Sequence, residues 1–111
     1  MKKMNEDWSD EWLDEVVTGN RLVLFMKGTP EQPMCGFSNR AAMVLSQLDE
    51  PFTSVNVLSD PNAIPSVCSW SDFPTMPQVF VHGELIGGSD IALEMYQSGE
   101  LQKMLEDGNS S

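Results

Sequence analysis

The chain has 111 residues, a length that suits one compact domain, and 41% of them are hydrophobic. Its net charge is −11, which argues against nucleic-acid binding, because neutralising phosphates requires clustered Lys and Arg. No apolar stretch approaches the roughly 20 residues that span a bilayer, so we expect no membrane partner.

The first part of the chain predicts a helix followed by a buried strand. Residues 1–8 are expected to form a charged tail, and residues 107–111 a polar one. Ser9–Thr18 predicts a helix, since Ser9 can cap its start and apolar residues recur within it at helical spacing. An apolar run without alternation follows over Arg21–Met26, which is typical of a strand covered on both faces.

The middle of the chain predicts a helix, a strand and a second helix. A loop with two prolines, Lys27–Met34, leads into a helix over about Cys35–Leu48, which has an apolar stripe at helical spacing. Thr53–Leu58 predicts the next strand. The segment Ser59-Asp60-Pro61 is typical of a helix start, and the helix that it begins is expected to be short.

The last part of the chain predicts a hairpin and a closing helix. Gln78–Val81 and Glu84–Gly87 are expected to be strands joined by a tight turn. Ser89 or Asp90 is then expected to cap a helix that is interrupted at Ser98-Gly99. The order is therefore α-β-α-β-α-β-β-α.

This order predicts an α/β fold. The β-α-β start implies a parallel strand pair with a right-handed crossover, and the hairpin adds antiparallel strands. A four-stranded mixed sheet flanked by helices is the thioredoxin-like architecture. We expect no internal repeat and a single domain over residues 1–111, with its core over about residues 9–106.

Cys35 is the candidate reactive residue. It lies where the chain leaves a strand and enters a helix, so unpaired backbone N–H groups and the helix dipole favour its thiolate. A thiolate attacks disulfides and binds soft metals; a buried structural cysteine is the alternative. Ser38 takes the place of the second cysteine of a dithiol motif.

Cys68 has no ligand spacing to Cys35 and is expected to act as a small hydrophobe, with a resolving thiol as the alternative.

Two further segments predict ligand contacts. Pro77 precedes a strand, and in a thioredoxin-like fold its peptide bond would be cis, with the Met76 backbone facing the thiol and free to pair with an extended peptide. The segment Gly87-Gly88-Ser89-Asp90 opens a helix whose N–H groups can bind a carboxylate. The one histidine, His82, is expected to be a solvated turn residue, and no zinc signature is present.

These segments together resemble the monothiol glutaredoxins of the CGFS type. Four motifs occur in register between about Arg21 and Leu105. They are Lys27-Gly28-Thr29-Pro30, Cys35-Gly36-Phe37-Ser38, Pro74-Thr75-Met76-Pro77-Gln78 and Gly87-Gly88-Ser89-Asp90. The resemblance implies a single glutaredoxin domain that binds glutathione and a [2Fe–2S] cluster shared between two subunits.

The resemblance also implies residue roles. Cys35 would ligate iron or form the mixed disulfide with glutathione, and Phe37 would shield the cluster. The residues expected to contact glutathione are Lys27, Phe37, Thr75, Met76, Pro77, Gly88, Ser89 and Asp90. Among these, Lys27 would lie near the glycyl carboxylate, the Met76 backbone would pair with the cysteinyl unit, and Ser89 and Asp90 would hold the γ-glutamyl end.

Three positions depart from the family pattern. Ile64 stands where relatives often have an arginine or a similar polar residue that binds the glycyl carboxylate, although the alignment there is loose. If the register holds, Lys27 makes that contact nearly alone. Ser89 replaces a cysteine of some relatives, and Phe73 replaces a common tryptophan.

Ligand counting predicts how a cluster would bind. A [2Fe–2S] centre normally takes four thiolates, so two copies of Cys35 and two glutathione thiols would complete the set. We therefore expect a monomer without the cluster and a homodimer with it, acting as an iron–sulfur carrier or scaffold. The resemblance further implies a BolA-type partner and recipient apoproteins.

Two other functions remain open. Cys35 could serve a monothiol glutathione-dependent disulfide oxidoreductase, in which external glutathione resolves the intermediate. The proline-bearing loop before Cys35 favours the carrier, because the resemblance associates that loop with poor reductase turnover. A purely structural adaptor would not need Cys35.

With no secretory signal and only two cysteines, we expect a cytoplasmic location, and a mature organellar form stays open.

Overall fold

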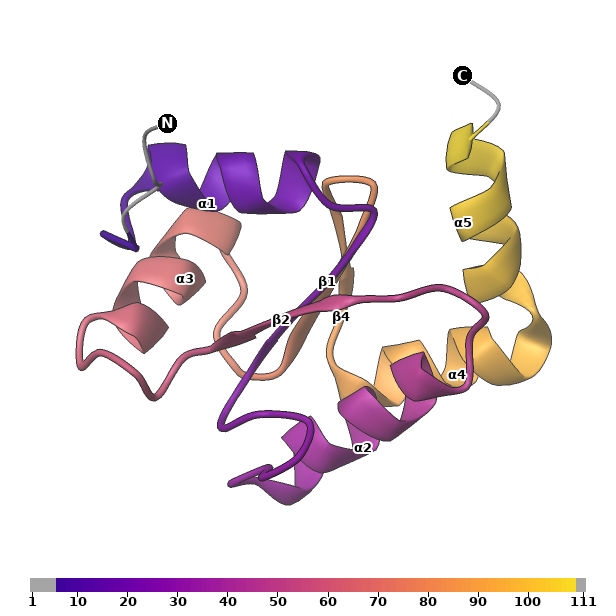
Figure 1. The fold of residues 1–111 in the computed structure, drawn as a ribbon, viewed down its shortest axis with the longest axis horizontal. Coiled ribbons are helices and arrows are strands. Elements are labelled where there is room, and N and C mark those ends of the chain that lie inside the picture. Colours follow the sequence, from indigo (N-terminus) through magenta and orange to yellow (C-terminus); the bar gives the residue numbers. More distant parts are fainter. Residues whose placement is uncertain (1–5, 110–111) are drawn as a thin grey trace.

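A four-stranded mixed sheet lies at the centre of the computed structural model, which describes residues 6–109 (Figure 1). Its strands are β1 (Leu22–Met26), β2 (Thr53–Asn56), β3 (Gln78–Val81) and β4 (Glu84–Gly87), in the order β2-β1-β3-β4. The β1–β2 pair is parallel, and the β1–β3 and β3–β4 pairs are antiparallel. The parallel pair and the hairpin that the element order predicts are both present.

Five helices cover the two faces of this sheet (Figure 1). The helices α1 (Asp10–Thr18) and α3 (Ala63–Ser71) pack on one face. The helices α2 (Gly36–Ser46), α4 (Ser89–Ser98) and α5 (Glu100–Asn109) pack on the other. None of the helices within residues 6–109 is long and apolar enough to cross a bilayer.

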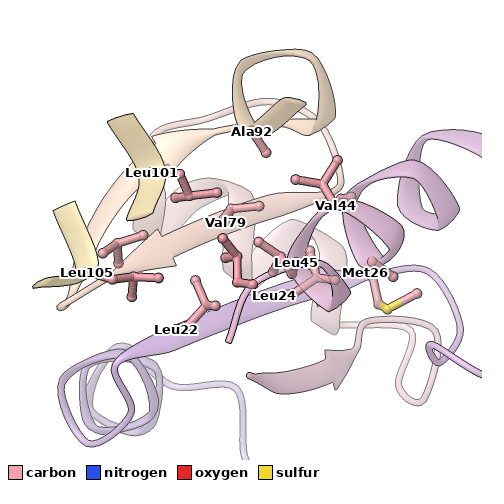
Figure 2. Packing of buried hydrophobic residues seen from close by; sticks show 13 residues of the cluster. Leu22, Leu24, Met26, Val44, Leu45, Val79, Ala92, Leu101 and Leu105 are labelled. Atoms are coloured by element: carbon pink, nitrogen blue, oxygen red, sulfur yellow. The ribbon is translucent and has the colours of Figure 1, made fainter. Parts of the chain in front are cut away.

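Strand β1 supplies apolar side chains to both layers, because successive side chains of a strand point to opposite faces. Leu22, Leu24 and Met26 pack with α2, α4 and α5, as Figure 2 shows, while Val23 and Phe25 pack with α1 and α3. All five residues of β1 are buried, which confirms the strand predicted from the apolar run. Burial on both faces fixes the end of β1, where the segment leading to Cys35 begins.

Trp8 corrects the predicted charged tail. Its side chain is only 5% exposed and meets the Trp12 ring edge-on, with the ring centroids 4.9 Å apart. The apolar face of α1 therefore extends past its cap, Ser9, whose side chain accepts a hydrogen bond from the Trp12 N–H as predicted. Residues 1–5 of that tail lie outside the described residues.

Several element boundaries also differ from the prediction. Strand β2 ends at Asn56 and not at Leu58, because the Asn56 side-chain oxygen accepts the Leu58 N–H and turns the chain. Helix α2 ends at Ser46, two residues before Leu48. The interrupted last helix is two helices, since Gly99 has a φ of +84° and ends α4. The predicted polar tail is helical up to Asn109.

Candidate functional site

Cys35 is the N-cap residue of α2 and is partly exposed. Its thiol has a lowered pKa, chiefly because the backbone N–H of Ser38 donates to the sulfur. The Phe37 N–H, the Ser38 hydroxyl and the charge of Lys27 lower the pKa further, while partial burial opposes them. The helix start therefore stabilises a thiolate at this position, for the reason that the sequence suggests.

Ser38 has a structural role that sequence reasoning missed. Its side chain is completely buried, and its oxygen accepts a hydrogen bond from the Lys27 N–H at 3.0 Å. The same hydroxyl also helps to lower the pKa of the Cys35 thiol. Ser38 thus joins the end of β1 to the first turn of α2 and to the thiol. The sequence feature that could have predicted this role is the position of Ser38, a small polar residue in the first turn of a helix, where its side chain can reach the N-cap residue.

The loop between Lys27 and Cys35 is closed by its own backbone. The N–H of Met34 donates to the Lys27 carbonyl at 2.9 Å, and Thr29 and Gln32 exchange two backbone hydrogen bonds of 3.2 and 3.0 Å. Asn56 of β2 supports the loop from outside, because its side-chain oxygen also accepts the Gly28 N–H at 3.0 Å. The loop is therefore a braced turn that holds Lys27 beside the thiol.

The Met76–Pro77 peptide bond is cis, as the predicted thioredoxin-like fold requires. Gln78, the first residue of β3, is fully buried below it. Its side-chain nitrogen donates to the carbonyls of Phe73 and Thr75, both at 3.1 Å, and so holds the segment before the proline in place. The sequence motif contained Gln78, but its bracing role depends on these tertiary contacts.

The start of α4 forms the other side of the site. Its N-cap residue is Gly88, and not Ser89 or Asp90 as the sequence predicts. Gly88 supplies no side-chain hydrogen bond, so first-turn N–H groups remain available to a ligand. A Cβ at Gly88 would lie 3.4 Å from the Pro77 carbonyl oxygen, so the start of α4 lies in van der Waals contact with the cis proline. Ser89 is buried, and Asp90 is exposed.

These segments enclose one groove of about 800 Å³. It is lined by Cys35 and by all eight residues expected to contact glutathione: Lys27, Phe37, Thr75, Met76, Pro77, Gly88, Ser89 and Asp90. The remaining lining is apolar and consists of Ile64, Phe73, Pro74 and Ile91. Lys27 is the only cation in the lining, and Asp90 is the only carboxylate. The arrangement can therefore hold a small zwitterionic thiol against Cys35.

Comparison with known proteins identifies the family. The glutaredoxin family model matches residues 22–86. An uncharacterised monothiol glutaredoxin of Synechocystis sp. is 49% identical over 94 residues, which are 85% of this chain and 88% of that protein. The chain belongs to the monothiol glutaredoxin family.

Two further matches agree with this membership. The mitochondrial monothiol glutaredoxin-S15 of Arabidopsis thaliana is 45% identical over 109 residues, which are 96% of this chain and 64% of that protein. The solution structure of reduced poplar apo GrxS14 superposes with a TM-score of 0.76 at 45% identity, covering 89% of this chain and 91% of that one. The thioredoxin-like fold predicted from the element order is thereby confirmed.

Ile64 contributes an apolar side chain to the groove. Its side chain is partly buried against the core layer beneath α1 and α3, and it lines the groove that contains Cys35. Ile64 therefore lies at the groove, as its alignment with the family motifs predicts. Pro74 and Ile91 also line the groove. The sequence analysis predicted no ligand contact for either residue, although Pro74 lies inside one of the four motifs.

Cys68 and His82 are not part of the groove. Cys68 lies on α3, partly buried, and burial raises the pKa of its thiol, as expected for a small hydrophobe. His82 is exposed in the β3–β4 turn, and its Nε2 lies 3.0 Å from the Leu105 carbonyl oxygen. Cys35 is therefore the only cysteine that this glutaredoxin presents to the groove.

Proposed function

We propose that this glutaredoxin is an iron–sulfur carrier that binds glutathione and a [2Fe–2S] cluster between two copies of the chain. The observation that supports this most directly is the single partly exposed Cys35, with its lowered pKa, at the edge of a groove suited to glutathione. The cluster is the cargo, and the chain's own task is to hold a thiolate and a glutathione side by side.

The charges and backbone groups of the groove fit glutathione. The N–H groups at the start of α4 suit the α-carboxylate of the γ-glutamyl end, and the Asp90 carboxylate suits its ammonium. The Met76 backbone before the cis proline can pair with the cysteinyl unit, which places the ligand thiol toward Cys35. Lys27 remains for the glycyl carboxylate.

The donor set also fits a cluster that is shared. Within residues 6–109, no three His, Cys, Asp or Glu side chains gather closely enough to hold a metal ion. Cys35 therefore supplies one ligand of the four that a [2Fe–2S] centre takes, and a second copy with two glutathione thiols would supply the others. We expect a homodimer when the cluster is bound and a monomer when it is absent.

The surface beside Cys35 favours transfer over storage. Met34 and Phe37 flank the cysteine and are 69% and 57% exposed, so apolar surface surrounds the thiol and is available to a partner. Half of the proposed ligands are diffusible glutathione molecules, so the cluster should be exchangeable. Recipient apoproteins and a BolA-type protein are the partners that we propose for this surface.

The test is anaerobic reconstitution with iron, sulfide and glutathione, followed by visible absorption and mass measurement. A coloured dimer that forms only with glutathione, and that Cys35→Ser abolishes, would support the carrier. Cys68→Ser is the matched control and should leave colour and mass unchanged. A colourless monomer under every condition would overturn the proposal.

The second candidate is a monothiol disulfide oxidoreductase, and the lowered pKa of Cys35 favours it. The Cys35 thiolate would attack the glutathione sulfur of a mixed disulfide, releasing the substrate thiolate. A glutathione thiolate would then attack the Cys35–glutathione disulfide, regenerating the Cys35 thiolate and forming oxidised glutathione. Turnover of a glutathionylated peptide by the cluster-free protein tests this route separately.

The remaining expectations concern extent and location. We propose that residues 1–111 contain one glutaredoxin domain, since both core layers are built around the same sheet. We also propose a cytoplasmic location for the form described here. Fractionation of the source cells would test this, because recovery of the chain in an organelle would favour a mature organellar form.

A further inference from the structure

Arg40 lies where it competes with a ligand for Asp90. We propose that, in the free protein, Arg40 occupies Asp90 and has to release it before the ammonium of glutathione can bind there. Arg40 thereby lowers the affinity for γ-glutamyl ligands and sets its dependence on salt. This inference rests on the proposed glutathione site and adds a residue that the sequence motifs do not contain.

The first observation is a direct ion pair between Asp90, which lines the groove, and Arg40, which lies outside its lining. Nη1 of Arg40 on α2 donates to Oδ1 of Asp90 on α4 at 3.1 Å. The two residues are 50 positions apart in sequence, and their side chains are 50% and 81% exposed, respectively. The pair therefore joins the second turn of α2 to the first turn of α4, and the N-terminal ends of these two helices, at Cys35 and Gly88, border the groove.

The second observation is that the groove offers an ammonium no other carboxylate. Asp90 is the only acidic residue in its lining. An ammonium that binds Asp90 meets the guanidinium of Arg40 already on one carboxylate oxygen, and two like charges at such a distance repel each other. Arg40 therefore competes with the ammonium for Asp90, and glutathione binds more tightly when Arg40 has moved away.

The third observation is that a second position is available to the Arg40 side chain. Its side chain lines a separate cavity of about 490 Å³ between α2 and α4, together with Met43, Leu93 and Tyr96. The aliphatic part of a released Arg40 can lie on this apolar wall while its guanidinium stays in water. Exposed ion pairs are weak, so release is easy and the expected effect on affinity is a few-fold.

The experiment compares Arg40→Gln with a charge-matched control, Lys103→Gln. Lys103 is exposed on α5 and absent from the groove lining, so its loss changes the net charge by the same amount without touching the site. The probe is S-methylglutathione, which cannot be oxidised, titrated by calorimetry into the cluster-free protein. At low salt, Arg40→Gln should bind the probe about two- to five-fold more tightly than Lys103→Gln. At high salt the ratio should approach one, because salt screens the ion pair.

A second measurement separates competition from a structural effect. N-acetyl-S-methylglutathione lacks the ammonium, so Arg40→Gln should bind it no more tightly than the control does. In an Asp90→Asn background, Arg40→Gln should likewise give no gain, since the two residues then no longer interact. Equal or weaker binding of S-methylglutathione by Arg40→Gln at low salt would overturn the inference. If the wild-type chain binds no probe at all, the glutathione site itself is wrong, and this inference falls with it.

Discussion

The backbone N–H of Lys27 donates to the buried hydroxyl of Ser38 at 3.0 Å, which joins the residue after β1 to the first turn of α2. The same hydroxyl also helps to lower the pKa of the Cys35 thiol. The residue that replaces the second cysteine of a dithiol motif is thus a connector between the sheet and the thiol. Its removal should affect both folding stability and thiol chemistry.

Ser38→Ala should destabilise the fold by about 1–3 kcal/mol, because the part-buried Lys27 N–H loses its acceptor. It should also raise the Cys35 pKa toward the ordinary thiol value and slow alkylation near neutral pH. Denaturant unfolding and iodoacetamide kinetics measure the two effects. Ser46→Ala is the control, since the Ser46 hydroxyl donates only to a carbonyl of its own helix. An unchanged alkylation rate in Ser38→Ala would contradict this assignment.

The two cysteines should react over different pH ranges. The Cys35 pKa lies below the ordinary thiol value and the Cys68 pKa above it, so Cys35 should be alkylated at pH values where Cys68 remains a thiol. Rates measured against pH in Cys68→Ser and in Cys35→Ser give each profile alone. Coinciding midpoints would show that the start of α2 does not activate Cys35.

The same shift predicts how stability depends on pH. Because the folded-state pKa of Cys35 lies below its unfolded-state value, the thiolate stabilises the fold fully above the unfolded-state pKa. This contribution should disappear as the pH falls through the folded-state pKa. The free energy of unfolding of Cys35→Ser, compared with wild type across this range, should differ more at the alkaline end.

Asn56→Ala should weaken the loop that precedes Cys35. The Asn56 side-chain oxygen accepts the N–H groups of Gly28 and Leu58 at 3.0 and 2.9 Å, and removing it leaves both without that partner. We expect a loss of about 1–3 kcal/mol in the free energy of unfolding. Asn62→Ala is the control, because Asn62 makes no side-chain cap hydrogen bond at the start of α3. Hydrogen exchange at Gly28 should also accelerate in the first variant only.

Trp8→Ala should destabilise the protein although Trp8 lies before the first helix. Its side chain is buried and packs on Trp12, so truncation removes a large apolar contact and should cost about 3–5 kcal/mol. Leu58→Ala is the control, since Leu58 is 48% exposed and should lose little. Equal melting temperatures for the two variants would show that Trp8 adds no stability.

Local patterns predicted most of the elements for identifiable reasons. The unbroken apolar run predicted β1 because a strand buried on both faces needs apolar side chains in succession. Ser9 predicted the start of α1 because its hydroxyl accepts a first-turn N–H. The misplaced boundaries have tertiary causes: Trp8 is buried by its contact with the Trp12 ring, and Asn56 ends β2 through its contacts with the following segments.

The sequence by itself determined the order of strands and helices, the position of Cys35 at a helix start and the cis proline before β3, because each depends on neighbouring residues or a recognisable motif. Only the tertiary structure decided that Ser38 supports the thiol and that Arg40 pairs with Asp90. These contacts join residues that are up to 50 positions apart. Their existence depends on how the helices pack on the sheet, which no local pattern specifies.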